Sequence, residues 1–531
     1  MIIKQYWKLA GIFLLALVLR LYKLGEIPVG FHADEIMNGY VGRFILLNGK
    51  DLYGNAWPLI YFDRFGDYPQ VLPMYLSGLF TFIFGVNEFA VRFPIALAGS
   101  LLVLPVYFLS LYFFKDKKSA LCGSFLAAIL PWHIVLSRAT AEGITGLTVF
   151  ATAIFFTFKA INNNSKKDYF FAAFLFFSSY FLYASFRVLT PLVLLPLPFL
   201  FKKQRLPLLE MFIASSLITF AISQTYWGQG RFKQTSLFVS KTTANQIKSK
   251  NEALSFGEGQ GNVLVARIFH NKIVGYSREF ILQYLSYFSP NFLFLNGGLP
   301  DRYKVPDQGL FYLSFIPFLL LGFINIAKKT DKRLMVLLIY LLIISPLPAS
   351  FTVDDAPNIH RAIFMIAPLV IIAGSGLSMG LNIRWGKYLI AIVLIAESIY
   401  FFHQYFNHSA SYESFLRNNG NKELALYLKD NYDKYDKIFM TNQDTLPLYY
   451  LFFTNNFSKE FIGKFRKDLL IDKIDNISFY EDWCPSERID LLTLKPNTLI
   501  VDRNCAYGPK LKVVERIKRQ DSTEAYRLLE L

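Results

Sequence analysis

The sequence predicts an α-helical polytopic membrane protein followed by a small soluble α/β domain, and three observations carry this prediction. The 531 residues are 53% hydrophobic and 17% aromatic, and only 18% are charged, whereas soluble globular proteins carry nearer a quarter. The mean hydropathy is +0.34. Apolar runs long enough to cross a bilayer recur as far as residue 403. This composition excludes disordered, fibrous and disulfide-scaffold proteins.

The basic residues are placed as a membrane topology requires. The chain has 55 Lys and Arg against 39 Asp and Glu, a net charge of +16. Residues 404–531 hold 19 basic and 19 acidic side chains, so the whole excess lies in residues 1–403. A nucleic-acid-binding protein would instead concentrate that excess on a soluble domain. We therefore expect the lipid bilayer, and no nucleic acid, as a partner.

Eleven apolar runs predict eleven transmembrane helices. Short polar segments between alternate pairs of runs hold 17 basic and 3 acidic residues, and by the positive-inside rule these segments face the cytoplasm. The N-terminus is then cytoplasmic and the C-terminus extracytoplasmic, in the cytoplasmic membrane of the cell. The predicted spans are 6–22, 91–114, 119–137, 143–158, 169–186, 188–201, 206–225, 309–327, 334–350, 361–381 and 387–403.

Two further apolar runs, 69–86 and 280–298, do not fit as spans. If either crossed the bilayer, later basic segments would move to the outer side. We expect both to form interfacial or re-entrant helices on the outer face, where Pro69, Pro73 and Pro290 are tolerated. No small-residue cleavage site follows the first span, which predicts an uncleaved anchor.

The predicted domains are a membrane domain over 1–403 and an extracytoplasmic domain over 404–531. The membrane domain includes two outer loops, 23–90 and 226–308. In the C-terminal domain we expect one helix over 411–432. We expect short strands at 437–441, 498–502, 511–517 and 526–531.

The three cysteines indicate no metal site, because no metal-ligand spacing with His appears. Cys122 lies in a predicted span and reads as a small apolar residue. Cys484 and Cys505 lie on the outer side, where a disulfide persists. A disulfide and two unpaired thiols both stay open.

The first outer loop contains the sequence Phe31-His32-Ala33-Asp34-Glu35. A carboxylate at the membrane surface can accept a proton from an alcohol, because apolar surroundings bring its pKa toward the working range. The alternative is structural: Asp34 caps a following helix and Glu35 lies in its first turn. Both interpretations stay open from the residues alone.

Three short outer segments carry cationic groups. Ser137-Arg138 to Glu142 forms a tight outer turn, and Arg187 lies at the outer end of another span. His360 and Arg361, after Asp354 and Asp355, would suit a phosphate at headgroup depth, while the aspartates would suit a divalent ion that holds the same phosphate. The alternative is that the arginines are interfacial anchors. Together with the carboxylates, these segments favour an enzyme that uses a lipid-phosphate substrate outside the cytoplasm.

Several of these segments resemble the GT-C glycosyltransferases, in particular bacterial relatives of the dolichyl-phosphate-mannose protein mannosyltransferases and the lipid A aminoarabinose transferases. The resemblance extends from the first span to about Phe158 and is weaker beyond. Its motifs are Leu19-Arg20-Leu21, Asp34-Glu35, Tyr40, Tyr68-Pro69, Gly85-Val86-Asn87-Glu88, Arg92-Phe93-Pro94, Pro131, Ser137-Arg138 to Glu142, Phe288-Ser289-Pro290-Asn291 and His360-Arg361.

The resemblance implies a GT-C fold of about eleven spans and inverting transfer of a sugar from a polyprenyl-phosphate donor. The acceptor would be a protein, lipid or glycan on the outer face. Asp34 would be the general base, and Glu35 and Glu142 would complete the catalytic carboxylates. The donor phosphate would contact Arg92, Arg138, Arg187, His360 and Arg361; Tyr40, Asp67 and Tyr68 would complete the first-loop site.

The chain departs from the family at one place. Where the family often has a Lys or His before Pro-Pro-Leu, this chain has Asp67-Tyr68-Pro69. One of the outer arginines would then have to supply the phosphate contact. Because phosphate is a good leaving group, no cofactor is required, although a bound divalent metal ion stays open.

Two other functions remain in competition. A polyprenyl-pyrophosphate glycan ligase or polymerase would use the basic loop 226–279 for a larger anionic donor. A lipid-linked substrate transporter would carry ionisable residues inside spans, and the candidates are Glu210 and Glu397. No internal repeat of the transporter kind is visible.

Overall fold

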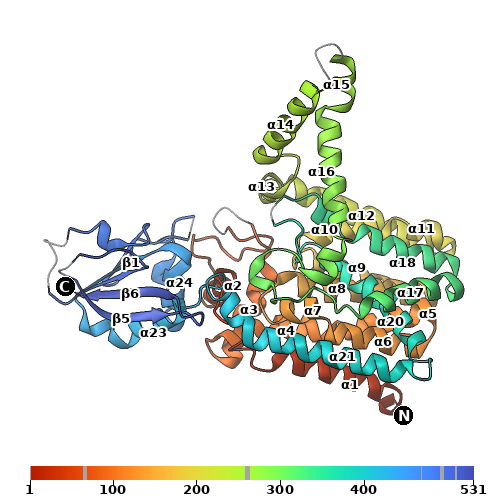
Figure 1. The fold of residues 1–531 in the computed structure, drawn as a ribbon, viewed down its shortest axis with the longest axis horizontal. Helices are drawn as coiled ribbons and strands as arrows, with labels where there is room; N and C mark the ends of the chain where they lie inside the picture. The colour runs from red at the N-terminus through yellow and green to blue at the C-terminus, as the bar shows by residue number, and fades with distance from the viewer. Residues whose placement is uncertain are drawn as a thin grey trace. The chain divides into compact units, whose positions relative to one another are not determined.

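The computed structural model describes residues 2–63, 68–257, 263–353, 355–467, 469–490, 496–508 and 511–530 (Figure 1). The chain divides into two compact units. Unit 1 contains residues 1–19, 98–135 and 141–401, and unit 2 contains residues 20–97, 136–140 and 402–531. Each unit is described below by itself.

Unit 1 consists of helices, and each predicted span overlaps at least one of them. Four helices (α1, α4, α7 and α21) contribute residues to both units. The helices are α1 (Ile2–Leu21), α4 (Glu88–Leu101), α5 (Val103–Phe114), α6 (Lys117–Ile129), α7 (Pro131–Ser137), α8 (Glu142–Asn163), α9 (Lys166–Ser179), α10 (Ser185–Leu194), α11 (Leu197–Leu200), α12 (Arg205–Gln224), α13 (Tyr226–Thr235), α14 (Lys241–Gly257), α15 (Val263–Phe269), α16 (Lys272–Ser286), α17 (Phe315–Lys329), α18 (Lys332–Ile344), α19 (Leu347–Ser350), α20 (Ile366–Gly380) and α21 (Gly386–His403).

Six helical segments of the described residues are long and apolar enough to cross a membrane, and a seventh arises if α6 and α7, bent by 53°, form one span. The predicted number of eleven therefore remains a prediction. Prolines explain part of the difference, because Pro131 and Pro196 interrupt apolar runs that the sequence presents as continuous. The six are Glu88–Phe114, Glu142–Asn163, Lys202–Gln224, Lys332–Ser350, Ile363–Gly380 and Gly386–Glu413.

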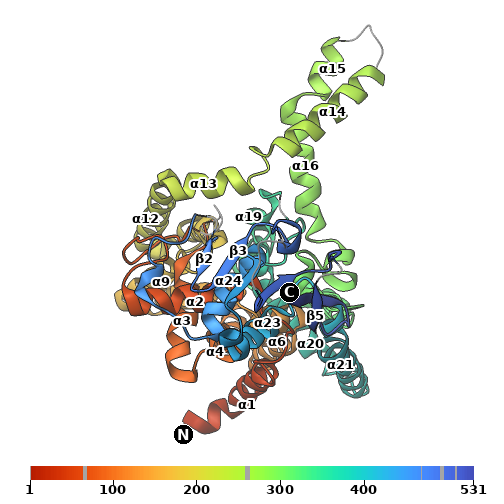
Figure 2. The same cartoon turned by 90° about the vertical axis from the view of Figure 1, so that its left-hand side faces the viewer.

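The core of unit 1 forms where α20 packs against α6 and α17 (Figure 1). Backbones approach closely here: a Cβ on Gly376 would lie 1.9 Å from the carbonyl oxygen of Phe318. Small residues permit this separation, as is common between membrane helices. In the second outer loop, α14 and α16 run side by side (Figure 2).

Unit 2 combines helices from the first outer loop with a C-terminal α/β fold. Its six strands have the order β2-β3-β1-β4-β6-β5. Strand β1 pairs in parallel with β3 and β4, and the other pairs are antiparallel. The elements are α2 (Ala33–Asn48), α3 (Val71–Phe84), α22 (Ser409–Glu413), α23 (Asn421–Asn431), α24 (Leu446–Phe453), β1 (Lys437–Thr441), β2 (Lys473–Ile474), β3 (Ile477–Tyr480), β4 (Thr498–Asp502), β5 (Lys512–Lys518) and β6 (Glu524–Glu530).

The predicted strands 437–441 and 498–502 are confirmed at the observed bounds, and those at 511–517 and 526–531 are confirmed within two residues. The single helix predicted over 411–432 is wrong. Helix α22 ends at Glu413 and α23 begins at Asn421, because Asn418 and Gly420 between them adopt left-handed conformations with φ of 56° and 106°. Strands β2 and β3 and helix α24 were not predicted.

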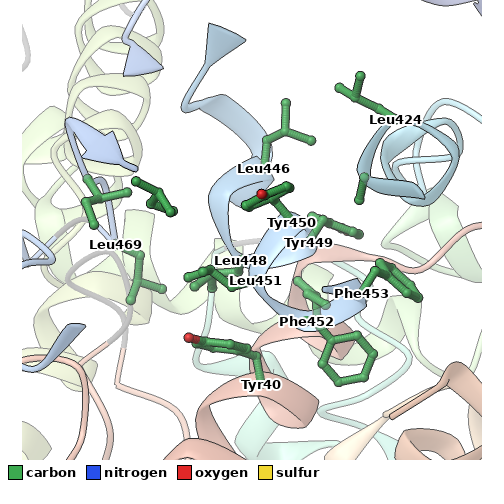
Figure 3. Close-up of a cluster of buried hydrophobic side chains, with 14 of the residues drawn as sticks. Tyr40, Leu424, Leu446, Leu448, Tyr449, Tyr450, Leu451, Phe452, Phe453 and Leu469 are labelled. Atoms are coloured by element: carbon green, nitrogen blue, oxygen red, sulfur yellow. The ribbon is translucent and has the colours of Figure 1, made fainter. Parts of the chain in front are cut away.

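One hydrophobic core joins the first outer loop to the C-terminal residues within unit 2. Tyr40 of α2 lies among side chains of α24, with Leu451 and Phe452 close by (Figure 3). Strand β4 is buried along its whole length, as expected for a central strand covered on both faces. The first loop is therefore part of a packed body that includes the C-terminal sheet.

Candidate active site

The first turn of α2 positions the paired carboxylates of unit 2. His32 is the N-cap residue: its Nδ1 accepts the Asp34 backbone N–H at 3.1 Å, and Glu35 Oε2 accepts the His32 backbone N–H at 3.0 Å. This capping box fixes the two acidic residues at the positive end of a helix dipole. Asp34 Oδ2 lies 3.3 Å from His32 Nδ1, and the Asp34 side chain is 25% exposed.

Glu35, in contrast, is buried between two arginines. Its Oε1 accepts from Arg92 Nε at 2.8 Å, and its Oε2 accepts from Arg417 at 2.6 Å and from Arg92 at 3.1 Å. Burial acts to raise the pKa of Glu35, but the two guanidinium groups outweigh it and hold that pKa below its usual value. Glu35 is therefore a fixed anion at neutral pH.

Arg92 is saturated with acceptors. Besides Glu35, it donates to the carbonyl oxygens of Leu24 at 3.1 Å, Pro28 at 3.0 Å and Gly30 at 2.6 Å. A guanidinium has five N–H donors, and these contacts use all five. Arg92 thus holds the 24–30 segment and the start of α2 in place, and no N–H of it is left for a phosphate.

Residues 417 and 418 clamp the same loop from the C-terminal side. Arg417 Nε donates to the Val29 carbonyl oxygen at 3.1 Å, and Asn418 Oδ1 accepts the Ala33 backbone N–H at 3.2 Å. Gly30 has φ of +74°, and a Cβ there would lie 2.4 Å from the Arg417 carbonyl oxygen, so a larger residue does not fit. The clamp therefore determines where the first turn of α2 lies.

Tyr449 and Glu413 complete this region of unit 2. The Tyr449 hydroxyl donates to the Phe31 carbonyl oxygen. Glu413, which is 2% exposed, lies 3.9 Å from Arg417 Nε. Burial raises the pKa of Glu413 to about 8, so this carboxyl group is mainly protonated at neutral pH. Glu35, Arg92, Arg417 and Glu413 thus form a buried cluster of one carboxylate, two guanidinium groups and one neutral carboxyl group.

Arg138, which the sequence placed near a donor phosphate, is also buried. It donates to the carbonyl oxygens of Arg20 at 3.1 Å, Tyr22 at 2.6 Å and Ile27 at 3.0 Å. Its guanidinium lies 5.6 Å from the Tyr405 ring centroid. These contacts order the chain that leads from α1 into the first loop.

Of the remaining first-loop residues of the prediction, the structure describes Tyr40 and Tyr68. Tyr40 is buried, donates to the Asn456 carbonyl oxygen at 3.0 Å and stacks on Phe457 with ring centroids 4.9 Å apart. Tyr68 is buried. Asp67 lies outside the residues that the structure describes, as does Asp354.

Unit 1 brings a second set of predicted residues together. Glu142 begins α8, and both Glu142 and Arg361 lie within electrostatic range of Tyr183. The Asn358 side chain accepts the backbone N–H groups of His360 and Arg361, each at 2.9 Å. This turn fixes His360 and Arg361 next to the start of α8, where the His360 carbonyl oxygen lies 3.4 Å from a Cβ built on Gly143.

Aromatic hydroxyl groups surround this second set. The Tyr303 and His360 rings are 4.6 Å apart, and the Tyr287 hydroxyl accepts the Asn358 backbone N–H at 2.9 Å. Burial raises the pKa of Tyr287 to about 12, so the phenol is protonated at neutral pH. A carboxylate, a guanidinium, an imidazole and phenols at one place are suited to hold a sugar phosphate.

Arg187 lies at the start of α10 and is buried; its Nε donates to the Tyr180 carbonyl oxygen at 3.0 Å. Among the described residues, one group of three potential metal ligands lies within 4.8 Å of one another: Cys484, Glu487 and Cys505. Cys484 and Cys505 form a disulfide, with Cα atoms 6.3 Å apart. Their sulfur atoms are therefore not thiolate ligands.

Sequence reasoning missed Arg417, Glu413 and the three tyrosines. Arg417 lies 382 residues from Glu35, and no local pattern connects such distant residues. The one available signal was the spacing of Glu413 and Arg417, which are four residues apart in the predicted helix 411–432. That spacing places two opposite charges on one helix face. The chain has 31 tyrosines, and no sequence pattern distinguishes Tyr183, Tyr287 and Tyr303 from the rest.

Comparisons with known proteins show which family model and which folds this chain is similar to. The family model of the dolichyl-phosphate-mannose-protein mannosyltransferases matches residues 67–227. The structure is similar to that of ArnT from Cupriavidus metallidurans bound to undecaprenyl phosphate, with a TM-score of 0.54 and 12% identity over 99% of this chain and 98% of that chain. A search of curated proteins gave no match.

A further similar structure is the archaeal oligosaccharyltransferase AglB from Archaeoglobus fulgidus, in complex with an inhibitory peptide and a dolichol-phosphate. Its TM-score is 0.48 at 14% identity, and the match covers 87% of this chain and 65% of that chain. This chain therefore spans 65% of the length of AglB. At these identities the likeness concerns the fold.

Proposed function

We propose, from the premise that the chain belongs to the GT-C glycosyltransferases, that it transfers a sugar from a polyprenyl-phosphate donor to an acceptor. The ArnT structure to which it is similar contains undecaprenyl phosphate, which supports a lipid-phosphate donor. The acceptor is a protein, lipid or glycan at the outer face of the cytoplasmic membrane. The chain then crosses that membrane eleven times, with the N-terminus inside and residues 404–531 outside.

The observation that carries this proposal is the difference between the two adjacent carboxylates. Glu35 is 1% exposed and ion-paired, whereas the Asp34 side chain is 25% exposed at the N-terminus of α2. Only Asp34 of this pair can meet a substrate hydroxyl. We therefore assign Asp34 as the general base, and Glu35 as the residue that positions it.

The mechanism is a single inverting displacement. Asp34 takes the proton of the acceptor hydroxyl, and the acceptor oxygen forms a bond to the anomeric carbon of the sugar. The bond from that carbon to the phosphate oxygen breaks, and the polyprenyl phosphate leaves with the electron pair. No cofactor is required for this step, and a divalent metal ion would only add charge stabilisation at the phosphate.

The phosphate-binding role falls to the cationic residues of unit 1. Arg361 and His360, fixed by the Asn358 turn, supply charge-assisted donors, and Glu142 shapes the site beside them. Arg92 and Arg138 are occupied by carbonyl oxygens and act by holding the first loop. Arg187 is retained as a candidate contact for the lipid phosphate.

The transporter alternative has less support. Glu397, the candidate intramembrane carboxylate, accepts the Ser314 backbone N–H at 3.1 Å, which satisfies it within unit 1. Glu210 is exposed on α12. Glu397 is thus accounted for without a transported substrate. A polyprenyl-pyrophosphate glycan ligase or polymerase remains the competing function, and the donor test below separates it.

The test uses purified full-length protein in liposomes with a panel of radiolabelled polyprenyl-phosphate monosaccharides and one polyprenyl-pyrophosphate oligosaccharide. We expect one monosaccharide donor to release polyprenyl phosphate and the sugar to appear on an acceptor or in water. Turnover of the pyrophosphate donor alone would favour a ligase or polymerase. Turnover of no donor would contradict the proposal.

A further inference from the structure

Unit 1 contains a cavity of about 520 Å³ that the proposed reaction does not use. Its walls come from the C-terminal ends of α5 and α8 and from the N-terminal end of α18. Helices α5 and α18 lie together in this unit (Figure 1). Glu142 begins α8, and Lys159, which lines the cavity, is seventeen residues further along, about 25 Å at 1.5 Å per residue. The cavity is thus at the opposite end of α8 from Glu142.

The cavity combines an apolar wall with a cationic rim. Phe108 and Phe155 stack with ring centroids 4.9 Å apart, and Tyr112 lines the same wall. The rim carries Lys115 and Arg333, whose side chains are exposed. An aromatic wall below cationic groups is the pattern with which proteins receive the chain and the headgroup of an anionic lipid.

The charges around the cavity nearly balance and leave one positive charge. Lys159 is paired with Asp168 at 3.0 Å. Asp331 also lines the cavity and caps α18, where its Oδ1 accepts the Arg333 backbone N–H at 2.9 Å. Lys115 and Arg333 against Asp331 give a net charge of +1, which matches a phosphodiester with one negative charge better than a phosphate monoester with up to two.

We propose that this cavity binds the phosphodiester headgroup of an anionic phospholipid. In the proposed topology, all these basic residues lie in cytoplasmic segments, so the lipid comes from the inner leaflet. The assignment to the inner leaflet depends on that proposed topology. The binding itself does not, because it follows from the cavity and its charges. A failure of lipid binding and a failure of sugar transfer are therefore measured separately.

The test is native mass spectrometry of the full-length protein, released from nanodiscs that contain phosphatidylglycerol and phosphatidylcholine with the same acyl chains. We expect retention of phosphatidylglycerol over phosphatidylcholine, and a loss of that preference on the order of tenfold in Lys115→Ala/Arg333→Ala. The matched control is Arg384→Ala/Lys387→Ala, which removes two exposed cations of another predicted cytoplasmic segment. It should retain the lipid as the wild type does.

Two competitors define what would overturn the proposal. Inorganic phosphate in excess should leave phosphatidylglycerol bound, because it makes no contact with the aromatic wall; displacement by phosphate alone would indicate an ion site. Polyprenyl phosphate should compete poorly, and stronger binding than phosphatidylglycerol would assign the cavity to the carrier lipid instead. Equal retention in the double variant and the wild type would contradict any lipid site here.

Discussion

Among single residues, the ions around Glu35 depend on one another. Glu35 receives Arg92 from α4 and Arg417 from the loop after α22, and all three side chains are at most 1% exposed. A buried ion pair adds little to stability as a whole, but removing one partner leaves an uncompensated charge. The consequence is that each member is costly to change, although in the proposed mechanism only Asp34 beside them meets the substrate.

Arg417→Ala should therefore destabilise the protein by about 3–5 kcal/mol, because the buried carboxylate of Glu35 loses one of its two cations. Thermal unfolding of the full-length protein in detergent measures this. The matched control is Arg466→Ala, which breaks an exposed ion pair with Glu481 at 2.8 Å and should cost about 0–1 kcal/mol. Equal losses in the two variants would contradict the clamp.

The same cluster predicts a pH dependence. The pKa of Glu35 is lower in the folded protein than in the unfolded chain, so the unfolded chain binds a proton first as the pH falls. Its contribution to stability is present above about pH 4.3 and is lost as the pH falls through the folded pKa. Denaturant titrations between about pH 4.3 and 3 should show this decline in the wild type. At higher pH Glu413 has the opposite effect, because burial raises its folded pKa to about 8. The Glu35→Gln variant should be less stable at pH 7, and its unfolding free energy should change less with pH over that range. An equally steep decline in the variant would mean that other carboxylates cause the effect.

At the scale of elements, α24 ties the first loop to the C-terminal sheet. Its Phe452 packs against Phe31 with ring centroids 5.7 Å apart, and its Tyr449 donates to the Phe31 carbonyl oxygen. The break between α22 and α23 turns Arg417 and Asn418 toward the same loop. In a continuous helix over 411–432, Arg417 and Asn418 would not have this orientation toward the first loop.

Phe452→Ala should cost about 3–5 kcal/mol of unfolding free energy, because it leaves a cavity in the shared core of unit 2. Leu426→Ala on α23, where the side chain is 36% exposed, is the control and should cost much less. The measurement is again thermal unfolding, together with protease sensitivity of the first loop. A resistant first loop in Phe452→Ala would mean that the loop folds without α24.

At the scale of the whole molecule, the sequence predicts what local patterns determine. Apolar runs located the apolar helices of unit 1, and short buried runs located β1 and β4. The more polar helices α13 and α14, and the short helix α15, lie in the predicted loop 226–279 and were not predicted. The pairing of Glu35 with Arg417 could not be predicted, since packing between segments hundreds of residues apart leaves no periodic signal. The exposure of Asp34 and the burial of Glu35 likewise depend on that packing. The residues alone therefore did not distinguish the two carboxylates, and only the family resemblance named Asp34 as the base.

Truncation after Phe401 should abolish donor turnover with every acceptor, because unit 2 would lose Arg417, α24 and the sheet. Donor hydrolysis by the purified truncated protein checks this, with chain integrity measured by gel filtration. A truncated protein that keeps turnover and changes only its acceptor would instead mark residues 404–531 as a separate acceptor-recognition domain.

The assignment of Asp34 as the general base is tested most directly by comparing kcat for the accepted donor between Asp34→Asn and the wild type. The control is Glu26→Gln, an isosteric change in the same loop at a side chain that is 72% exposed. We predict that Asp34→Asn lowers kcat by about 10²–10⁴-fold with unchanged thermal stability, while Glu26→Gln keeps the wild-type rate. A stable Asp34→Asn protein with the wild-type kcat would contradict the account.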